Sequence, residues 1–114
     1  MSGIESALSK SIREALTARG AIVTRVQSGI IPAMYGKTRR YIHLAPKGTP
    51  DALVEFELAR GGWGYGFAEI KTPTGKLSTD QRRWHAKAIE QGRNVAVWRS
   101  IREALRDLEI WRRL

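Results

Sequence analysis

The sequence predicts an α/β domain in which a mixed β-sheet is flanked by helices. Three observations predict it: some stretches repeat their apolar residues with a helical period, others alternate with period two, and one predicted helix lies between two predicted strands. That strand–helix–strand arrangement favours a right-handed crossover between parallel strands. A chain of 114 residues is the size of one domain with one core, so residues 1–114 are predicted to form a single domain.

The first helix is predicted at residues 3–19, opened by Ser2 and stopped at Gly20. Its apolar residues fall in one stripe, and Glu5 projects into that stripe, where a carboxylate needs an explanation. Two explanations stay open with equal weight. Glu5 either completes a capping box with Ser2 or reaches towards a functional site.

The middle of the chain is predicted to be largely extended. Apolar and alternating stretches indicate strands at residues 21–27, 41–44, 51–58 and 65–71. Residues 28–36 are predicted as a loop because they contain two glycines and Pro32. The stretch 45–50 is predicted as a turn, and the glycine-rich stretch 60–64 as the hairpin turn between the last two strands.

The C-terminal third predicts helix, strand and helix. A helix at residues 79–91 has Ser78 and Gln81 in capping-box spacing and stops at Gly92. Residues 95–98 form a short apolar run, typical of a buried strand. A last helix opens at Ser100, and its predicted core face comprises Ile101, Ala104, Leu105 and Leu108.

The charge of the chain indicates a phosphate-bearing partner. Lysine and arginine number 20 against 11 acidic residues, a net charge of +9, which is typical of nucleic-acid binding, although a merely soluble basic protein stays open. The absence of cysteine excludes disulfides and thiolate metal sites. We find neither an apolar run of membrane-spanning length nor a signal-peptide pattern, so we expect a soluble intracellular protein.

Two acids and a lysine form the candidate site. Asp51 opens one predicted strand, and Glu69 and Lys71 share one face of the next because side chains alternate along a strand. Carboxylates and carbonyls suit Mg²⁺, so Asp51, Glu69 and the carbonyl of Ile70 are predicted to hold a divalent cation against a phosphodiester, with Glu5 as a possible further ligand. Lys71 would orient the attacking water or hold a phosphate oxygen.

These residues resemble a known group of enzymes. Gly48-Thr49-Pro50-Asp51, then Glu69-Ile70-Lys71, then Gln81 on the next helix, with Glu5 on the first, are similar to the PD-(D/E)xK nuclease superfamily and to its small stand-alone VRR-NUC domains of phages and bacteria. The resemblance covers nearly the whole chain. It implies a restriction-endonuclease-like core, dependence on Mg²⁺ or Mn²⁺, hydrolysis of DNA phosphodiesters, and often a homodimer acting on branched DNA such as a Holliday junction. For a phage or bacterial protein, the location would be the bacterial cytoplasm.

Several residues have two readings. Gln81 either positions the water or a phosphate, or serves only as the capping-box partner of Ser78. His43 and His85 are isolated in the sequence and are left out of the predicted metal site. The candidate phosphate contacts flank the site in sequence; they are Arg39, Arg40, Lys47, Lys76, Arg82 and Arg83.

An alternative function belongs to a different class. The chain would be a DNA- or RNA-binding module without catalysis, and Asp51, Glu69 and Lys71 would form a structural ion-pair cluster across neighbouring strands. Both functions predict binding that weakens with salt, so salt dependence does not separate them. Dependence of cleavage on a divalent metal does.

Overall fold

A computed structural model describes residues 6–28, 30–43 and 45–114, with the backbone alone described at residues 30–35 and 39–43. Along the chain the elements are α1 (Ala7–Ala18), β1 (Ile22–Arg25), β2 (Ile30–Tyr35), β3 (Thr38–His43), β4 (Ala52–Glu57), β5 (Trp63–Ile70), α2 (Thr79–Glu90), β6 (Val95–Trp98) and α3 (Ile101–Arg112).

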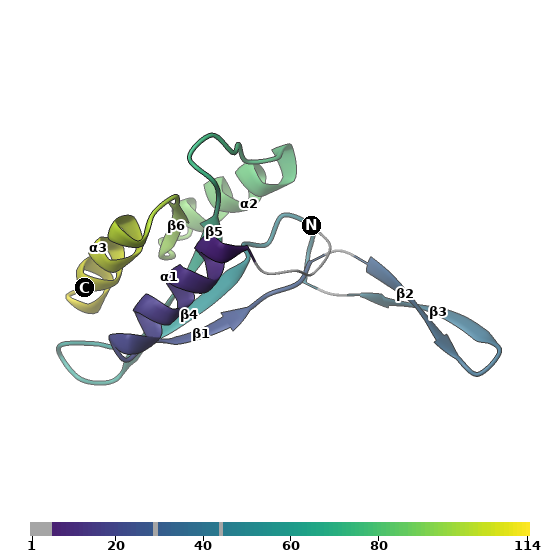
Figure 1. The fold of residues 1–114 in the computed structure, drawn as a ribbon, viewed down its shortest axis with the longest axis horizontal. Coiled ribbons are helices and arrows are strands. Elements are labelled where there is room, and N and C mark those ends of the chain that lie inside the picture. The colour runs from purple at the N-terminus through teal and green to yellow at the C-terminus, as the bar shows by residue number, and fades with distance from the viewer. Residues whose placement is uncertain (1–5, 29, 44) are drawn as a thin grey trace.

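The main sheet has four strands in the order β1-β4-β5-β6. The strands β1, β4 and β5 pair antiparallel, and β6 joins β5 in parallel through α2, which confirms the predicted mixed sheet and the predicted link between parallel strands. The helices α1 and α3 pack together on one face of this sheet (Figure 1). On the opposite face, Trp84 of α2 packs on Phe67 of β5 with ring centroids 5.0 Å apart.

Aromatic rings fill the core between the sheet and α3. Trp111 lies 5.9 Å from Phe56 and 5.6 Å from Trp98, measured between ring centroids, and all three side chains are buried. The buried indole of Trp98 donates its Nε1–H to Asp107 Oδ2 at 2.8 Å, which satisfies the one polar atom of that ring. Trp98 and Trp111 therefore belong to the core of the domain.

Three expectations about the elements are wrong. The first helix begins at Ala7 rather than residue 3, because Ser6 is its N-cap and accepts a hydrogen bond from Ser9 N at 3.1 Å. The stretch 28–36 contains strand β2 instead of a loop. Ile101 is 39% exposed, because it is the first residue of α3 and the buried stripe of that helix runs through Ala104, Leu108 and Trp111.

The strand β2 pairs antiparallel with β3, and the two form a separate ribbon that projects from the body of the molecule (Figure 1). Pro32 favoured a loop in the sequence-based prediction, because proline has no N–H to donate to a neighbouring strand. Both strands of a two-stranded ribbon are edge strands, and an edge strand tolerates the missing N–H. Gly36 has a φ of +63° in the tight turn between the strands, a conformation that glycine adopts without steric cost.

Gly66 in β5 provides a test of the core. A Cβ added there would lie 2.5 Å from Cζ3 of Trp111, whose rings are held by Phe56 and Trp98. We expect Gly66→Ala to lower the free energy of unfolding by about 1–3 kcal/mol through overpacking, measured by urea denaturation. Gly64→Ala on the same strand is the matched control, because its Cβ would meet Leu58 Cδ2 and Phe56 Cε2 at 3.0 Å, a milder overlap than the one at Gly66. Equal losses for the two variants would contradict this account of the core.

Candidate functional site

The register of β4 and β5 brings the predicted acids together. Ala52 pairs with Ala68 in an antiparallel ladder, so the next pair outward places Asp51 opposite Glu69. Glu69 and Phe67 are two residues apart on β5, so their side chains lie on the same face of the sheet. The ring of Phe67 packs against Trp84 of α2, and the side chain of Glu69 also points towards α2. Lys71, two residues on, follows the end of β5. The structure therefore brings Asp51, Glu69 and Lys71 to one corner of the sheet.

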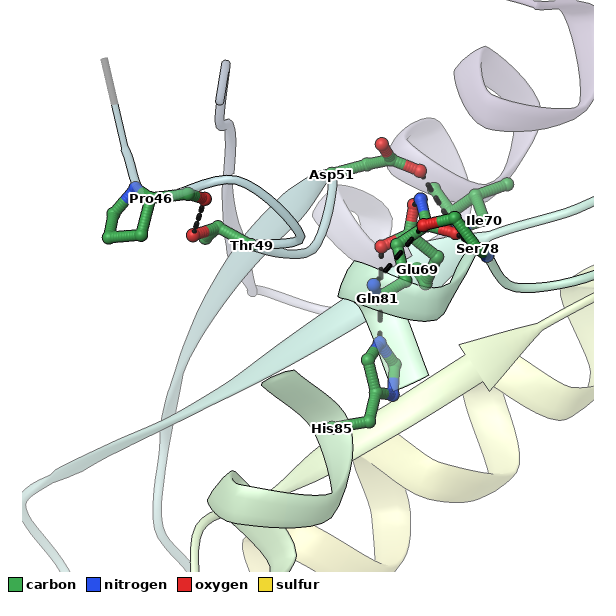
Figure 2. Close-up of polar contacts among 8 residues, drawn as sticks. All are labelled: Pro46, Thr49, Asp51, Glu69, Ile70, Ser78, Gln81 and His85. Atoms are coloured by element: carbon green, nitrogen blue, oxygen red, sulfur yellow. Dashed lines mark hydrogen bonds and ion pairs between the residues drawn. The ribbon is translucent and has the colours of Figure 1, made fainter. Parts of the chain in front are cut away.

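Asp51 is held in place although it is exposed. Its Oδ2 accepts the backbone N–H of Ile70 at 3.1 Å (Figure 2). Its own carbonyl accepts the N–H of Val26 at 2.7 Å. These bonds tie the residue before β4 to both β5 and the end of β1. The carboxylate is thus fixed at the edge of the sheet with its second oxygen, Oδ1, available to a ligand.

Glu69 is the most unusual residue of the site. Its side chain is 1% exposed, yet only Oε1 has a hydrogen bond, from Gln81 Nε2 at 3.0 Å. The second oxygen, Oε2, has no hydrogen-bond partner among the described residues. A buried carboxylate oxygen without a hydrogen bond costs free energy, so Oε2 is the atom of the site that a bound group would stabilise most.

Gln81 combines the two roles that the sequence left as alternatives. The capping box is present: Gln81 Oε1 accepts the N–H of Ser78 at 2.8 Å, and Ser78 Oγ accepts the N–H of Gln81 at 3.2 Å. The other end of the same amide donates to Glu69 (Figure 2). The start of α2 thus fixes Gln81, and Gln81 fixes the carboxylate.

His85 is a site residue that the sequence reasoning left out. It is 6% exposed, and its Nε2 lies 3.9 Å from Glu69 Oε2, within ion-pair reach if the imidazole is protonated but too far for a hydrogen bond, so neither atom has a hydrogen-bond partner among the described residues. His85 is therefore not isolated in the fold. The available signal was its spacing of four residues from Gln81, which places both side chains on one face of α2.

Burial raises the pKa of Glu69 above its ordinary value, because a charged carboxylate loses its hydration there. His85 acts in the opposite direction, the neighbouring Asp51 raises the pKa further, and the positive charge of Lys71 lowers it with the smallest effect of these. Folding therefore holds two acids close together without neutralising them fully. A cation bound between them would offset both the cost of burying the charged carboxylate of Glu69 and its repulsion by Asp51.

The structure places the candidate phosphate contacts unevenly. Lys47 forms an ion pair with Asp80 at 3.4 Å, and Arg82 Nη1 donates to the carbonyl of Leu77 at 3.3 Å. Lys76 and Arg83 are exposed. Arg39 and Arg40 lie on β3, where the structure describes the backbone alone.

Glu5, the possible third acid, lies outside the described residues. The next residue along the chain, Ser6, lines a pocket of about 110 Å³ that Asp51 and Ile70 also line. Within residues 6–28, 30–43 and 45–114, no three histidine, aspartate or glutamate side chains gather into a metal-binding group. The described site thus supplies two carboxylates, with the Ile70 backbone beside them.

Comparisons with protein-family models, with curated proteins and with solved structures find no match to this chain. Among the described residues, no helix has the length and apolar character needed to cross a membrane. The case for a function therefore depends on the geometry and charge of the site itself.

Proposed function

We propose that the protein is a metal-dependent DNA endonuclease that hydrolyses phosphodiester bonds, built on a restriction-endonuclease-like core and similar to stand-alone VRR-NUC domains of the PD-(D/E)xK superfamily. One observation carries the proposal. Glu69 is a buried carboxylate with one oxygen held by Gln81 and the other without a hydrogen bond, 3.9 Å from His85 Nε2, and the register of the ladder places Asp51 opposite it. Like charges opposite each other destabilise a sheet, so this arrangement is costly unless a cation completes it.

The donor set fits a hard divalent cation. Asp51 and Glu69 would hold Mg²⁺ or Mn²⁺ through carboxylate oxygens, with the Ile70 carbonyl and Glu5 as the proposed additional ligands. Such an ion supplies an acidic bound water and polarises the phosphate. The unpaired Oε2 of Glu69 supports the fit, because a carboxylate that binds metal needs an oxygen that no protein donor occupies.

The side chains of this chain prepare the site in distinct ways. The Ile70 N–H orients Asp51, and the Gln81 amide orients Glu69, so neither carboxylate needs to reorganise when substrate binds. Lys71 places a positive charge beside both acids, where it would bind a non-bridging phosphate oxygen or hold the attacking water. The large positive charge of the chain favours binding of the DNA backbone.

The alternative is a nucleic-acid-binding module in which these residues form structural ion pairs. That reading expects Lys71 to pair with Asp51 or Glu69. Among the described ion pairs, none joins Lys71 to either acid within 4 Å. The nuclease proposal accounts better for a buried carboxylate whose Oε2 has no hydrogen bond, because a bound metal would occupy that oxygen.

A homodimer acting on branched DNA is part of the proposal. Two copies related by a two-fold axis would present two sites of opposite polarity, an arrangement suited to cutting two strands symmetrically. The preferred DNA structure would then depend on the distance between the two sites. Sedimentation in parallel with cleavage assays measures whether cutting follows dimer formation.

The proposal is tested with a panel of single-stranded, duplex, flap and four-way junction DNAs. We expect cleavage of at least one form with Mg²⁺ or Mn²⁺, and no cleavage with EDTA, because the carboxylates alone do not activate water. Metal-free protein to which Ca²⁺ is added serves as the control for binding without efficient chemistry. Tight binding with no cleavage of any DNA or RNA form by either metal would favour the binding module.

A further inference from the structure

The ribbon formed by β2 and β3 has no assigned role, and its charge is distinctive. Residues 28–47, which contain the ribbon and the chain leading from it, include four lysines and arginines and no acidic residue. Less than a fifth of the chain thus supplies four of its nine net positive charges. The ribbon also projects from the body of the molecule along its longest axis (Figure 1), and the extent of the whole molecule along that axis is 52 Å.

The base of the ribbon is fixed to the candidate site. The N–H of Ala45 donates to the carbonyl of Gln27 at 3.1 Å, which joins the segment that enters the ribbon to the segment that leaves it. The chain then turns through Gly48, where an added Cβ would collide with the backbone of Asp80 in α2, and reaches Asp51. The ribbon is therefore an insertion between β1 and the first acid of the site, anchored against the helix that carries Gln81.

Arginine and tyrosine occur on both faces of the ribbon. In the observed register Ala33 pairs with Arg40 and Tyr35 with Thr38, so period-two alternation places Arg40 and Tyr35 on one face. The other face has Arg39 and Tyr41 by the same alternation. Lys37 is exposed in the turn. Basic residues interleaved with aromatic residues on a narrow ribbon suit a nucleic-acid partner.

We infer that the β2–β3 ribbon is an arm that binds duplex DNA in a groove beside the site. Six-residue strands span about 20 Å, and a two-stranded ribbon fits the major groove of B-DNA. A second copy of the chain fits less well, because a two-fold contact between ribbons would bring like charges together in a protein already at +9. The inference deepens the proposed function and rests on its assignment of DNA as the partner.

The test neutralises the arm. The variant Lys37→Gln/Arg39→Gln/Arg40→Gln is compared with a control that removes equal charge from exposed positions on the helices, Lys87→Gln/Arg106→Gln/Arg113→Gln. Binding to a short duplex is measured by fluorescence anisotropy in EDTA across a salt series. We expect the arm variant to lose affinity about tenfold or more and its log–log salt slope to fall by roughly two to three, with little change in the control.

Two further measurements separate the outcomes. Sedimentation reports the oligomeric state, which we expect the arm variant to share with the parent. Hydrolysis of bis-p-nitrophenyl phosphate by the parent with Mn²⁺ reports the proposed catalysis separately from duplex binding. Unchanged duplex affinity in the arm variant overturns the inference, and so does a loss of affinity that accompanies conversion of a dimer to a monomer. A parent that binds duplex through the arm but hydrolyses nothing supports the arm and removes only the proposed catalysis.

Discussion

Asp51→Asn and Lys71→Ala are each expected to abolish DNA cleavage while DNA binding persists. Asparagine has nearly the shape of aspartate, and its side-chain oxygen can still accept the Ile70 N–H that Asp51 accepts at 3.1 Å. The change removes the negative charge that would hold the cation and leaves the backbone contact. We expect the cleavage rate to fall by about a thousandfold or more, on the order of 4 kcal/mol of transition-state stabilisation.

Metal affinity separates the roles of these two residues. Titration calorimetry with Mn²⁺ should show weaker binding in Asp51→Asn, because a charged ligand is lost. Lys71→Ala should bind Mn²⁺ at least as tightly as the parent, because a competing positive charge is removed. Lys71→Ala should therefore lower the cleavage rate without lowering the affinity for Mn²⁺.

The control is Asp80→Asn, a partly exposed acid that pairs with Lys47 near the start of α2. It removes the same charge from a position outside the carboxylate pair and should retain cleavage within about threefold, since exposed ion pairs contribute little. Cutting by Lys71→Ala at the parent rate would contradict the role of that lysine. Retained cutting by Asp51→Asn would contradict the whole donor set.

Strand alternation made the core of the site predictable. Period two predicts that Glu69 and Lys71 share a side, although β5 ends at Ile70 and Lys71 follows it. The short connection between β4 and β5 sets an antiparallel register that brings Asp51 opposite Glu69. The capping box of Ser78 and Gln81 was equally visible, because it depends on residues three apart. Local patterns predicted these features because local geometry determines them.

Features that depend on distant contacts were not predictable in the same way. The spacing of His85 from Gln81 puts both residues on one face of α2, but the approach of His85 to Glu69 depends on the packing of α2 against β5. The strand β2 contains Pro32 and glycines flank it, yet pairing with β3 overrides these local signals. The burial of Glu69 also follows from packing, since a charged residue in an alternating strand is equally compatible with exposure.

Glu69→Gln is expected to stabilise the protein at neutral pH while abolishing cleavage. Burial raises the pKa of Glu69, so the folded protein binds this proton more tightly than the unfolded chain. The stabilisation that the protonated carboxyl gives is complete below its ordinary pKa of 4.5 and is lost as pH rises through the folded value. Where the pH lies above that folded value the folded chain buries a charge, and glutamine removes that charge while its side-chain oxygen still accepts from Gln81.

The Tm of Glu69→Gln should exceed that of the parent by a few degrees at pH 7, and the difference should shrink as pH falls towards 4.5. The control Glu55→Gln, on an exposed position of β4, should leave the Tm unchanged. Adding Mn²⁺ should raise the Tm of the parent by mass action and leave that of Glu69→Gln nearly constant. A lower Tm for Glu69→Gln at pH 7, or an equal response of both proteins to Mn²⁺, would contradict the prediction. Either result would show that contacts within the folded chain stabilise this buried carboxylate and that a bound cation does not.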